Sequence, residues 1–390
     1  MTKKLKVAGF LRKQLAGEYR IILERTHSQT GKRSRRWHEF EGTKQEAHEE
    51  LARLKLRLSD HTAMSAEKIT VVQFLEKWLA HVKWDVSPRT HERYAEISRN
   101  NVAPLLGKIP LTKLRPQHIT VALQKAHANG RVDQSGGLSP QTLRHMYRIL
   151  FQAMSQAVRW HMLPLNPLDL VPVPEVQRPL LSIYSVEEAG SLFKAMEDTQ
   201  IFVPMLLALF LGLRRGEISA LRWRDIDLEA EKLSVSFSVQ QMNRSCRLLQ
   251  IQVPRQRTVA LPRLVVLALH KHQSQAQRLL LSQGKALSKD HFVCSLKNGR
   301  MMQPGQITHQ WIKEVRATNL PDFRFNDLRH SHAVHLLSLG VHVAAVSERL
   351  GHSSVGITAQ LYAGAILGAQ KDAVSRLDGA LLEVVAERSC

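Results

Sequence analysis

The 390-residue sequence is short of acidic residues. It carries 34 Asp and Glu against 55 Lys and Arg, which gives a formal net charge of +21 at pH 7. Self-repulsion of this size is most readily offset by a polyanionic partner. We therefore expect nucleic acid as the first class of partner and an anionic membrane surface as the second.

Long apolar segments and paired cysteines are also missing. The longest apolar run, FVPMLLALFLGL at 202–213, is too short to span a bilayer. The N-terminal stretch MTKKLKVAGF is basic but lacks the apolar core of a secretory signal. Three widely spaced cysteines, Cys246, Cys294 and Cys390, provide neither a disulfide framework nor a metal-binding spacing. These absences predict a cytoplasmic protein without a membrane partner.

The first part of the chain, residues 1–60, predicts a small basic β-sheet followed by a helix. Thr43 stands three residues before Glu46, which is the spacing of a helix-capping box. Trp37 and Phe40 interleave with basic residues, so we favour a DNA-binding arm over a merely solvated charged face. The candidate DNA contacts of this module are Lys32, Arg33, Arg35 and Arg36.

The next part, residues 69–163, predicts an all-α module with basic residues on its helices. Ser87-Pro88 and Ser139-Pro140 are each typical of a helix start, with serine as the cap and proline in the first turn. Its candidate DNA contacts are Arg89, Arg93, Arg99, Arg144 and Arg148. The proline-rich stretch that follows, at 164–179, predicts an extended linker without helix.

Residues 180–365 predict the largest domain, and 366–390 predict a helical tail. Ser185 and Glu188 have the spacing of a capping box, and the apolar run at 202–213 predicts a buried helix. The alternating segment LSVSFSVQ and the later RLLQIQV and RTVALP predict strands of one small sheet. The fold class is therefore mainly α with small antiparallel β-sheets, an α+β chain of several domains.

Four short motifs after the buried helix carry the chemistry. They are GLRRGE at 212–217, NDLR at 326–329, LGH at 350–352 and LY at 361–362. In this order they resemble the tyrosine recombinases, the family of phage and transposon integrases, whose signature is G-L-R-x-x-E, H-x-x-R, L-G-H and a tyrosine about ten residues on. The resemblance covers about residues 180–365 and implies a multi-domain tyrosine-recombinase architecture. In that architecture the helical module at 69–163 would be a SAM-like, core-binding DNA-binding domain, and 180–365 would be the catalytic domain.

The resemblance also implies a function and a set of roles. The chain would be a site-specific DNA recombinase that integrates or excises a mobile element through a 3′-phosphotyrosine, without metal or nucleotide cofactor. Tyr362 would be the nucleophile, Arg214 and Arg329 would bind the phosphate oxygens, and His352 would donate a hydrogen bond to the phosphate. Glu217 would orient an arginine.

Two departures from the family pattern keep an alternative open. Asn326 occupies the position of the family histidine, and asparagine cannot take up a proton. The family's lysine has no counterpart in 248–262, where the nearby polar residues are Gln252, Arg255, Gln256 and Arg257. Arg255 is the candidate replacement, although a guanidinium is a poor acid. The alternative is a catalytically impaired, recombinase-like DNA-binding protein with a regulatory or architectural role.

The remaining expectations concern partners and metals. The resemblance implies double-stranded DNA at specific attachment sites, a homo-tetramer on paired sites with the 366–390 tail packed on a neighbour, accessory DNA-bending proteins, and a place in the bacterial cytoplasm. The motif RHSHAVH is rich in histidine, but its spacing lacks the i, i+4 pair with a third ligand that zinc prefers on a helix. We expect no metal at His330, His332, His335 or His342.

Overall fold

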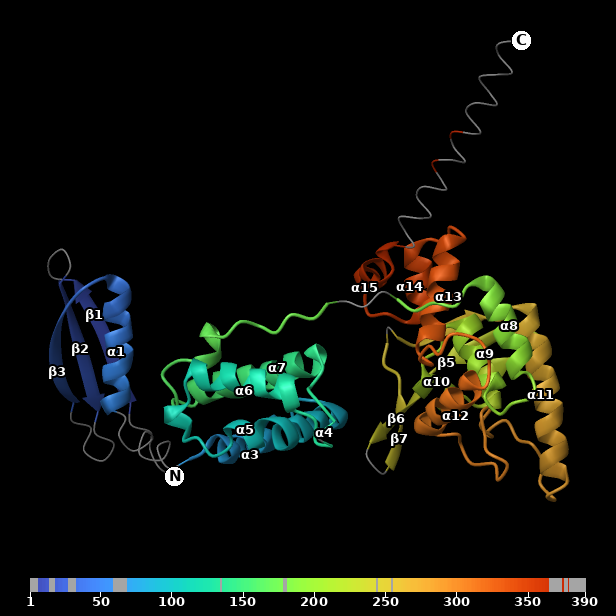
Figure 1. Cartoon of the computed structure of the whole chain (residues 1–390), viewed down its shortest axis with the longest axis horizontal. Helices are drawn as coiled ribbons and strands as arrows, with labels where there is room; N and C mark the ends of the chain where they lie inside the picture. The colour runs from blue at the N-terminus through green and yellow to red at the C-terminus, as the bar shows by residue number, and fades with distance from the viewer. Residues whose placement is uncertain are drawn as a thin grey trace, which may run out of the picture. The chain divides into compact units, whose positions relative to one another are not determined.

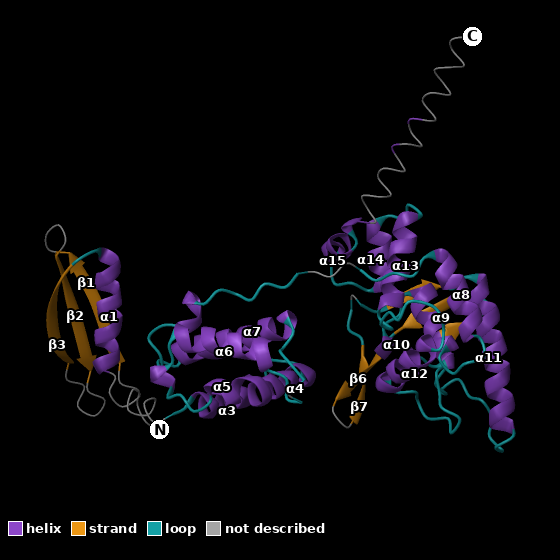
Figure 2. Cartoon of the chain, viewed as in Figure 1, coloured by secondary structure: helices purple, strands orange, loops and turns teal. Residues whose placement is uncertain are grey.

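The chain is mostly helical with small antiparallel sheets, which confirms the predicted fold class (Figure 2). A computed structural model describes residues 6–13, 18–26, 33–58, 69–133, 135–177, 181–242, 245–253, 255–364, 374 and 378. It divides into two compact units, Met1–Arg178 and Pro179–Cys390. Of the predicted tail at 366–390, only Val374 and Asp378 fall within the described residues.

The chain begins with a three-stranded antiparallel sheet covered by one helix (Figure 1). Its elements are β1 (Lys6–Lys13), β2 (Glu18–Thr26), β3 (Arg33–Glu41) and α1 (Lys44–Leu58). The predicted capping box is present, because the Glu46 carboxylate accepts from the Thr43 N–H at 2.8 Å and the Thr43 hydroxyl accepts from the Glu46 N–H at 3.3 Å. The backbone of β3 carries Arg33, Arg35 and Arg36, whereas Lys32 lies outside the described residues.

A helical module follows, with its own apolar core. Its helices are α3 (Val71–Val82), α4 (Pro88–Ile97), α5 (Ala103–Leu106), α6 (Pro116–Asn129) and α7 (Pro140–Arg159), with a π-helical turn at Ser98–Val102 and a 3₁₀ turn at Leu111–Lys113. The hydroxyls of Ser87 and Ser139 accept from the N–H groups of Thr90 at 3.2 Å and Thr142 at 3.3 Å. Both predicted helix starts are thereby confirmed.

The prediction that the proline-rich stretch contains no helix was wrong over four residues. Pro167–Leu170 forms a 3₁₀ helix, and the Asn166 side chain accepts from the Leu168 N–H at 3.0 Å. Proline at the first helical position costs nothing, because its missing N–H would have no partner there. The Tyr147 hydroxyl lies within hydrogen-bonding distance of the Leu168 and Val171 carbonyls, at 3.2 and 3.1 Å, which ties this turn to α7.

The second unit is built around the buried helix α9. Its helices are α8 (Val186–Met196), α9 (Phe202–Leu211), α10 (Arg215–Ala220), α11 (Arg263–Leu281), α12 (Pro304–Arg316), α13 (Asp327–Ser338), α14 (Val343–Leu350) and α15 (Val355–Leu361), with a 3₁₀ turn at Trp223–Asp225. The predicted capping box of Ser185 and Glu188 is present at the start of α8. Because α9 is apolar on all sides, it can lie only in the interior.

The strands of this unit form two small sheets instead of the single predicted one. A three-stranded sheet has the order β4 (Ile226–Asp227), β5 (Lys232–Val235) and β8 (Arg257–Ala260), and β6 (Phe237–Met242) pairs with β7 (Ser245–Gln250). All pairings are antiparallel, and the buried Leu233 and Val259 face each other across β5 and β8. This register fixes Arg257 at the start of β8, where the candidate site begins.

Candidate active site

The buried helix α9 ends in a turn that delivers the first arginine. Gly212 has φ +67°, and a Cβ there would lie 2.7 Å from a Leu350 methyl and 2.8 Å from the His332 ring. Only glycine fits both this left-handed conformation and this close approach of α13 and α14. The chain then turns into α10, with Arg214 at the helix start and its N–H donating to the Glu217 carboxylate at 2.8 Å.

Glu217 is a buried carboxylate shared by two arginines. It is 3% exposed, accepts from Arg214 Nη1 at 2.9 Å, and accepts two hydrogen bonds from Arg257, at 3.0 Å from Nη1 and 2.8 Å from Nη2. Burial alone would raise the pKa of the Glu217 carboxyl, but the hydrogen bonds and charge of Arg257, together with Arg214, lower it to about 2. Glu217 therefore stays ionised and orients both guanidinium groups, as the sequence motif suggested for one of them.

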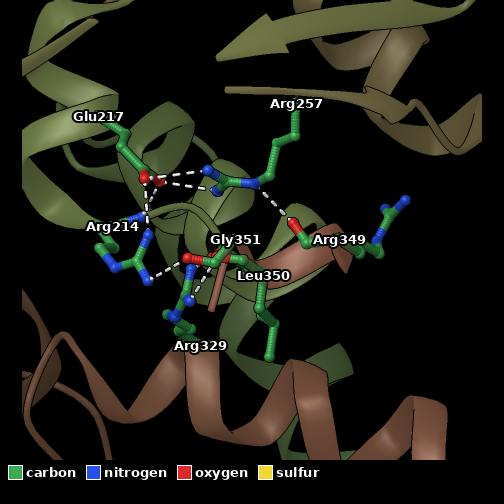
Figure 3. Close-up of polar contacts among 8 residues, drawn as sticks. Arg214, Glu217, Arg257, Arg329, Arg349, Leu350 and Gly351 are labelled. Carbon is green, nitrogen blue, oxygen red and sulfur yellow. Dashed lines mark hydrogen bonds and ion pairs between the residues drawn. The ribbon is translucent and has the colours of Figure 1, made fainter. Parts of the chain in front are cut away.

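Three consecutive carbonyls at the end of α14 each accept from a different arginine (Figure 3). The distances are 2.7 Å from Arg257 Nε to the Arg349 oxygen, 2.6 Å from Arg329 Nη2 to the Leu350 oxygen, and 2.9 Å from Arg214 Nη2 to the Gly351 oxygen. The last carbonyls of a helix have no partner within it and carry its negative dipole end, so they suit cationic donors.

Gly351 makes this convergence possible. Its φ is +64°, and a Cβ would lie 2.9 Å from Arg257 Nη1. Arg329 also donates to the Gly212 carbonyl, so its guanidinium bridges the end of α9 and the Leu350 carbonyl at the end of α14. A larger residue at Gly351 would displace Arg257 from its acceptors.

The cluster carries more positive than negative charge. Within the described part of the chain, Glu217 is the only carboxylate that pairs with Arg214, Arg257 or Arg329. Burial and the neighbouring charges of Arg214 and Arg257, against the opposing charge of Glu217, lower the pKa of Arg329 to about 9, so it stays protonated at neutral pH. The Arg214 side chain remains 41% exposed, which leaves an approach from solvent. An anion entering there would relieve the repulsion among the guanidinium groups.

His352 and Tyr362 complete the cluster. His352 Nδ1 lies 2.7 Å from the Thr358 hydroxyl, and burial with the charges of Arg329, Arg214 and Arg257 lowers the pKa of His352 to about 4. The imidazole is therefore neutral at pH 7 and can donate from only one nitrogen. Tyr362 follows α15, is 1% exposed, and has its hydroxyl 2.8 Å from His330 Nδ1.

The structure thus brings Arg214, Glu217, Arg329, His352 and Tyr362 together. Asn326 and Arg255, the two positions that depart from the family pattern, are both exposed. Asn326 is exposed at the start of α13 and makes no side-chain cap for that helix. Arg255 is exposed, and the arginine that enters the cluster from this stretch is Arg257. Sequence reasoning weighed Arg257 only as one polar neighbour among several, and it overlooked Thr358 and the contact of His330 with Tyr362.

The histidines of RHSHAVH each have a separate partner. His330 contacts the Tyr362 hydroxyl, His332 Nε2 accepts from Arg349 Nε at 3.0 Å, and His335 Nε2 lies 2.8 Å from the Tyr184 carbonyl. In the portion of the chain that the structure describes, no group of three His, Cys, Asp or Glu side chains is arranged to hold a metal ion. Nor does any described helix have the length and apolarity needed to cross a membrane.

Two family models match this chain and together cover more than half of it. Residues 184–365, which contain the whole arginine cluster and Tyr362, match the phage integrase family. Residues 70–126 match the N-terminal SAM-like domain of phage integrases. The chain belongs to the phage integrase family.

Relatives along most of the chain support this membership. A protein described as tyrosine recombinase XerC-like, from Caldanaerobacter subterraneus subsp. tengcongensis, is 26% identical over 385 residues, which is 92% of this chain and 95% of the relative. The ICEBs1 integrase of Bacillus subtilis strain 168 is 25% identical over 350 residues, which is 87% of this chain and 91% of the relative.

Solved integrase structures share the fold. The Tn1549 transposon integrase in complex with transposon right end DNA has a TM-score of 0.66 at 19% identity, over 80% of this chain and all (100%) of that one. A lambda integrase tetramer bound to a Holliday junction has a TM-score of 0.56 at 16% identity, over 88% of this chain and 95% of that one. At these identities the likeness concerns the fold.

Proposed function

We propose that this integrase-family chain cuts and rejoins DNA through a covalent bond between Tyr362 and a DNA phosphate. The observation that carries the proposal is the position of the Tyr362 phenol beside guanidinium groups held at the end of α14. Burial raises the pKa of Tyr362, while the charges of Arg329 and Arg214 act in the opposite direction. The integrase relatives agree with an overall function in site-specific recombination, integrating or excising a mobile element.

The chemistry follows from charge. Ionising a phenol with pKa near 10 at neutral pH costs about 4 kcal/mol. In the transition state, charge gathers on the two non-bridging phosphate oxygens, and arginine can bind both at once through parallel N–H groups. Arg214 and Arg329 each donate two hydrogen bonds to acceptors of the chain itself, which fixes the orientation of each guanidinium group before DNA binds. A preorganised donor of this kind contributes about 3–4 kcal/mol to the rate.

His352 supplies a further donor to the phosphate. Its Nδ1 faces the buried Thr358 hydroxyl, so a hydrogen bond donated by Thr358 places the imidazole proton on Nε2. A neutral imidazole in this tautomer donates to a phosphate oxygen without adding another charge to the cluster. The product is a 3′-phosphotyrosine and a free 5′-hydroxyl. The ester conserves the energy of the broken bond, so rejoining needs no nucleotide.

The helical module provides a second basic surface. Burial and the charges of Arg93 on α4 and Arg148 on α7 lower the pKa of His145, which places these two arginines close to one imidazole. Clusters of this kind bind the phosphate backbone of double-stranded DNA. We propose attachment-site DNA as the partner and, by likeness to the lambda integrase tetramer on a Holliday junction, a tetramer on paired sites.

The test uses nicked duplexes that tile the DNA flanking the gene of this chain. A nick beside the cleaved phosphate releases the short 5′-hydroxyl strand and traps the covalent complex, which runs as a slower band in a denaturing gel. The wild-type chain should form the band. Tyr362→Phe should not, although its affinity for the same duplex should remain unchanged.

Tyr184→Phe is the matched control. Tyr184 is also buried, but its hydroxyl donates to the Pro321 carbonyl at 2.6 Å and lies outside the cluster. This variant should still form the covalent band. A wild-type chain that binds a duplex specifically without any covalent product would instead establish the catalytically impaired, DNA-binding alternative. A band formed by Tyr362→Phe would refute Tyr362 as the nucleophile.

A further inference from the structure

One imidazole lies directly against the Tyr362 hydroxyl. His330 follows Arg329 on α13, and its Nδ1 is 2.8 Å from the Tyr362 oxygen, with the two ring centroids 5.8 Å apart. The contact joins residues 32 positions apart in the sequence. The first turn of α13 therefore presents a phosphate-binding arginine and a contact to the phenol on consecutive residues.

The protonation state and the tautomer of His330 together decide the direction of this hydrogen bond. Burial lowers the pKa of His330, the Asp327 carboxylate opposes this, and the charges of Arg329 and Arg324 lower it further. The imidazole is therefore neutral at pH 7. In the tautomer with its proton on Nε2, a neutral imidazole accepts at Nδ1 and the phenol is the donor. With 1% of Tyr362 exposed, Nδ1 is also the only described acceptor at hydrogen-bonding distance from the hydroxyl.

The other titratable side chains near the phenol have different partners. His352 Nδ1 is engaged by Thr358, and the pKa of His352 is lowered to about 4. Asn326 is exposed and its amide takes up no proton. Arg214 and Arg329 both donate to backbone carbonyls, and Arg329 stays protonated. His330 is thus the one described group that both contacts the reacting oxygen and can accept its proton.

We propose that His330 is the general base for Tyr362, an inference that rests on the proposed recombinase function. During cleavage Nδ1 takes the phenol proton as the tyrosine oxygen forms its bond to phosphorus. The bond from phosphorus to the 5′-oxygen breaks, and that oxygen leaves with the electron pair and takes a proton from water. In rejoining the 5′-hydroxyl gives its proton to water or hydroxide as it attacks phosphorus. The bond from phosphorus to the tyrosine oxygen breaks, and the imidazolium returns its proton to that departing oxygen.

The bound DNA makes this proton transfer easier. An imidazolium at His330 meets the positive charges of Arg329 and Arg324, and the Asp327 carboxylate opposes their effect. The DNA phosphate brings negative charge to Arg214 and Arg329, which reduces the repulsion that an imidazolium would meet. The base is consequently weak before DNA binds and stronger afterwards.

The variant His330→Asn distinguishes a role of His330 as a general base from a purely structural contact with Tyr362. The asparagine oxygen reaches about the same place as Nδ1 and can accept the phenol hydrogen bond, but it takes up no proton. The measurement is the single-turnover rate of covalent complex formation on the nicked duplex cleaved by the wild-type chain, across about pH 5 to 9. A general base predicts a loss of about 10²-fold or more at neutral pH. The loss should shrink as the pH rises, because hydroxide then replaces the base.

Two comparisons complete the experiment. His309→Asn, at an exposed histidine of α12, should cleave at the wild-type rate. A duplex with sulfur in place of the bridging 5′-oxygen needs no proton for its leaving group, so His330→Asn should remain as slow on it. Restoration of the rate by sulfur would move His330 to the leaving-group side and overturn the proposal.

The outcomes separate this proposal from the one on which it rests. A wild-type rate for His330→Asn, with Tyr362→Phe inactive, would overturn the base and leave the recombinase function standing. Covalent product from Tyr362→Phe, or none from the wild-type chain, would overturn both. Thermal melting and duplex affinity measured for each variant should match the wild-type values if the loss is chemical; a matching loss of folding or binding would overturn the assignment.

Discussion

The arginines of the active site and those of the helical module are held in opposite ways. In the active site, Arg257 is 4% exposed and donates to a buried carboxylate and a helix-end carbonyl. In the helical module, Arg93 is 43% exposed and pairs with Glu96 on the same face of α4. Arg257 is therefore fixed and desolvated, whereas Arg93 is solvated; Arg214 lies between them, held by Glu217 while 41% of its side chain stays exposed.

This difference predicts different tasks for the two regions. A desolvated guanidinium acts at full strength and needs no reorganisation when charge develops on a phosphate. A solvated one is screened by salt, and a pair one turn apart on a helix contributes only about 0.3–0.5 kcal/mol. The buried cluster should determine the rate of cleavage, and the exposed arginines should determine affinity for DNA.

The largest effect should come from breaking the buried cluster at Arg257. Arg257→Ala leaves the Glu217 carboxylate buried with Arg214 as its remaining ion-pair partner, which should cost about 3–5 kcal/mol of stability. Urea unfolding of the wild-type and variant chains measures this loss. The nearby Arg255→Ala is the control, because Arg255 is exposed and its removal should leave the midpoint unchanged.

The pH dependence of stability tests the same contact between Arg257 and Glu217. The folded-state pKa of Glu217 is lowered from 4.5 to about 2, so its contribution is present above about pH 4.5 and is lost as the pH falls towards 2. Arg257→Ala should flatten this acid limb of the stability curve. Equal acid limbs for the two chains would show that Arg257 does not hold the carboxylate ionised.

Arg329→Lys should have the next largest effect. It should lower the rate of DNA cleavage and not the stability of the fold. Lysine keeps a positive charge but cannot reach the Gly212 and Leu350 carbonyls and the phosphate with one rigid fork. We expect cleavage to slow by about 10²–10³-fold, with affinity for the duplex close to wild type. Single-turnover cleavage with saturating protein measures the rate. A rate within about threefold of wild type would remove Arg329 from the phosphate site.

Local motifs located most of the site because they sit at helix ends, whose geometry is fixed by neighbouring residues. Gly212 and Gly351 end α9 and α14 in the left-handed conformation, and each delivers the next motif residue. The helix caps at Thr43, Ser87, Ser139 and Ser185 were predictable for the same reason. The two glycines and the four caps depend on a few adjacent positions.

Arg257 and His330 were missed because their roles depend on contacts between distant segments. Arg257 reaches Glu217 across 40 positions. Arg255 and Arg257 are two positions apart, so a strand pattern would place both side chains on the same face and cannot show which one enters the cluster. The structure shows that β8 begins at Arg257. His330 could have been noticed as the neighbour of Arg329, but only folding shows that it faces Tyr362 and not solvent.

A smaller effect should follow from changing the exposed basic surface. Arg148→Ala on α7 should weaken DNA binding and lower the slope of log K against log[salt] by about one. Cleavage at saturating DNA should remain at the wild-type rate, because Arg148 lies outside the cluster around Glu217. Binding titrations over a range of salt concentrations measure the slope. A slower saturated rate would mean that the two regions are not separate in task.

The smallest effect should come from Asn326→His, which restores the histidine of the family motif. Asn326 is exposed at the start of α13, and its side chain does not cap that helix, so an imidazole there should fit without strain. It adds a titratable group near the phosphate site while His330 keeps its contact with Tyr362. We expect a cleavage rate equal to that of the wild-type chain or a few-fold higher, measured on the nicked duplex at neutral pH. A clear loss would show that the pocket is built around the amide, and that position 326 contacts the phosphate in a way that a bulkier ring disrupts.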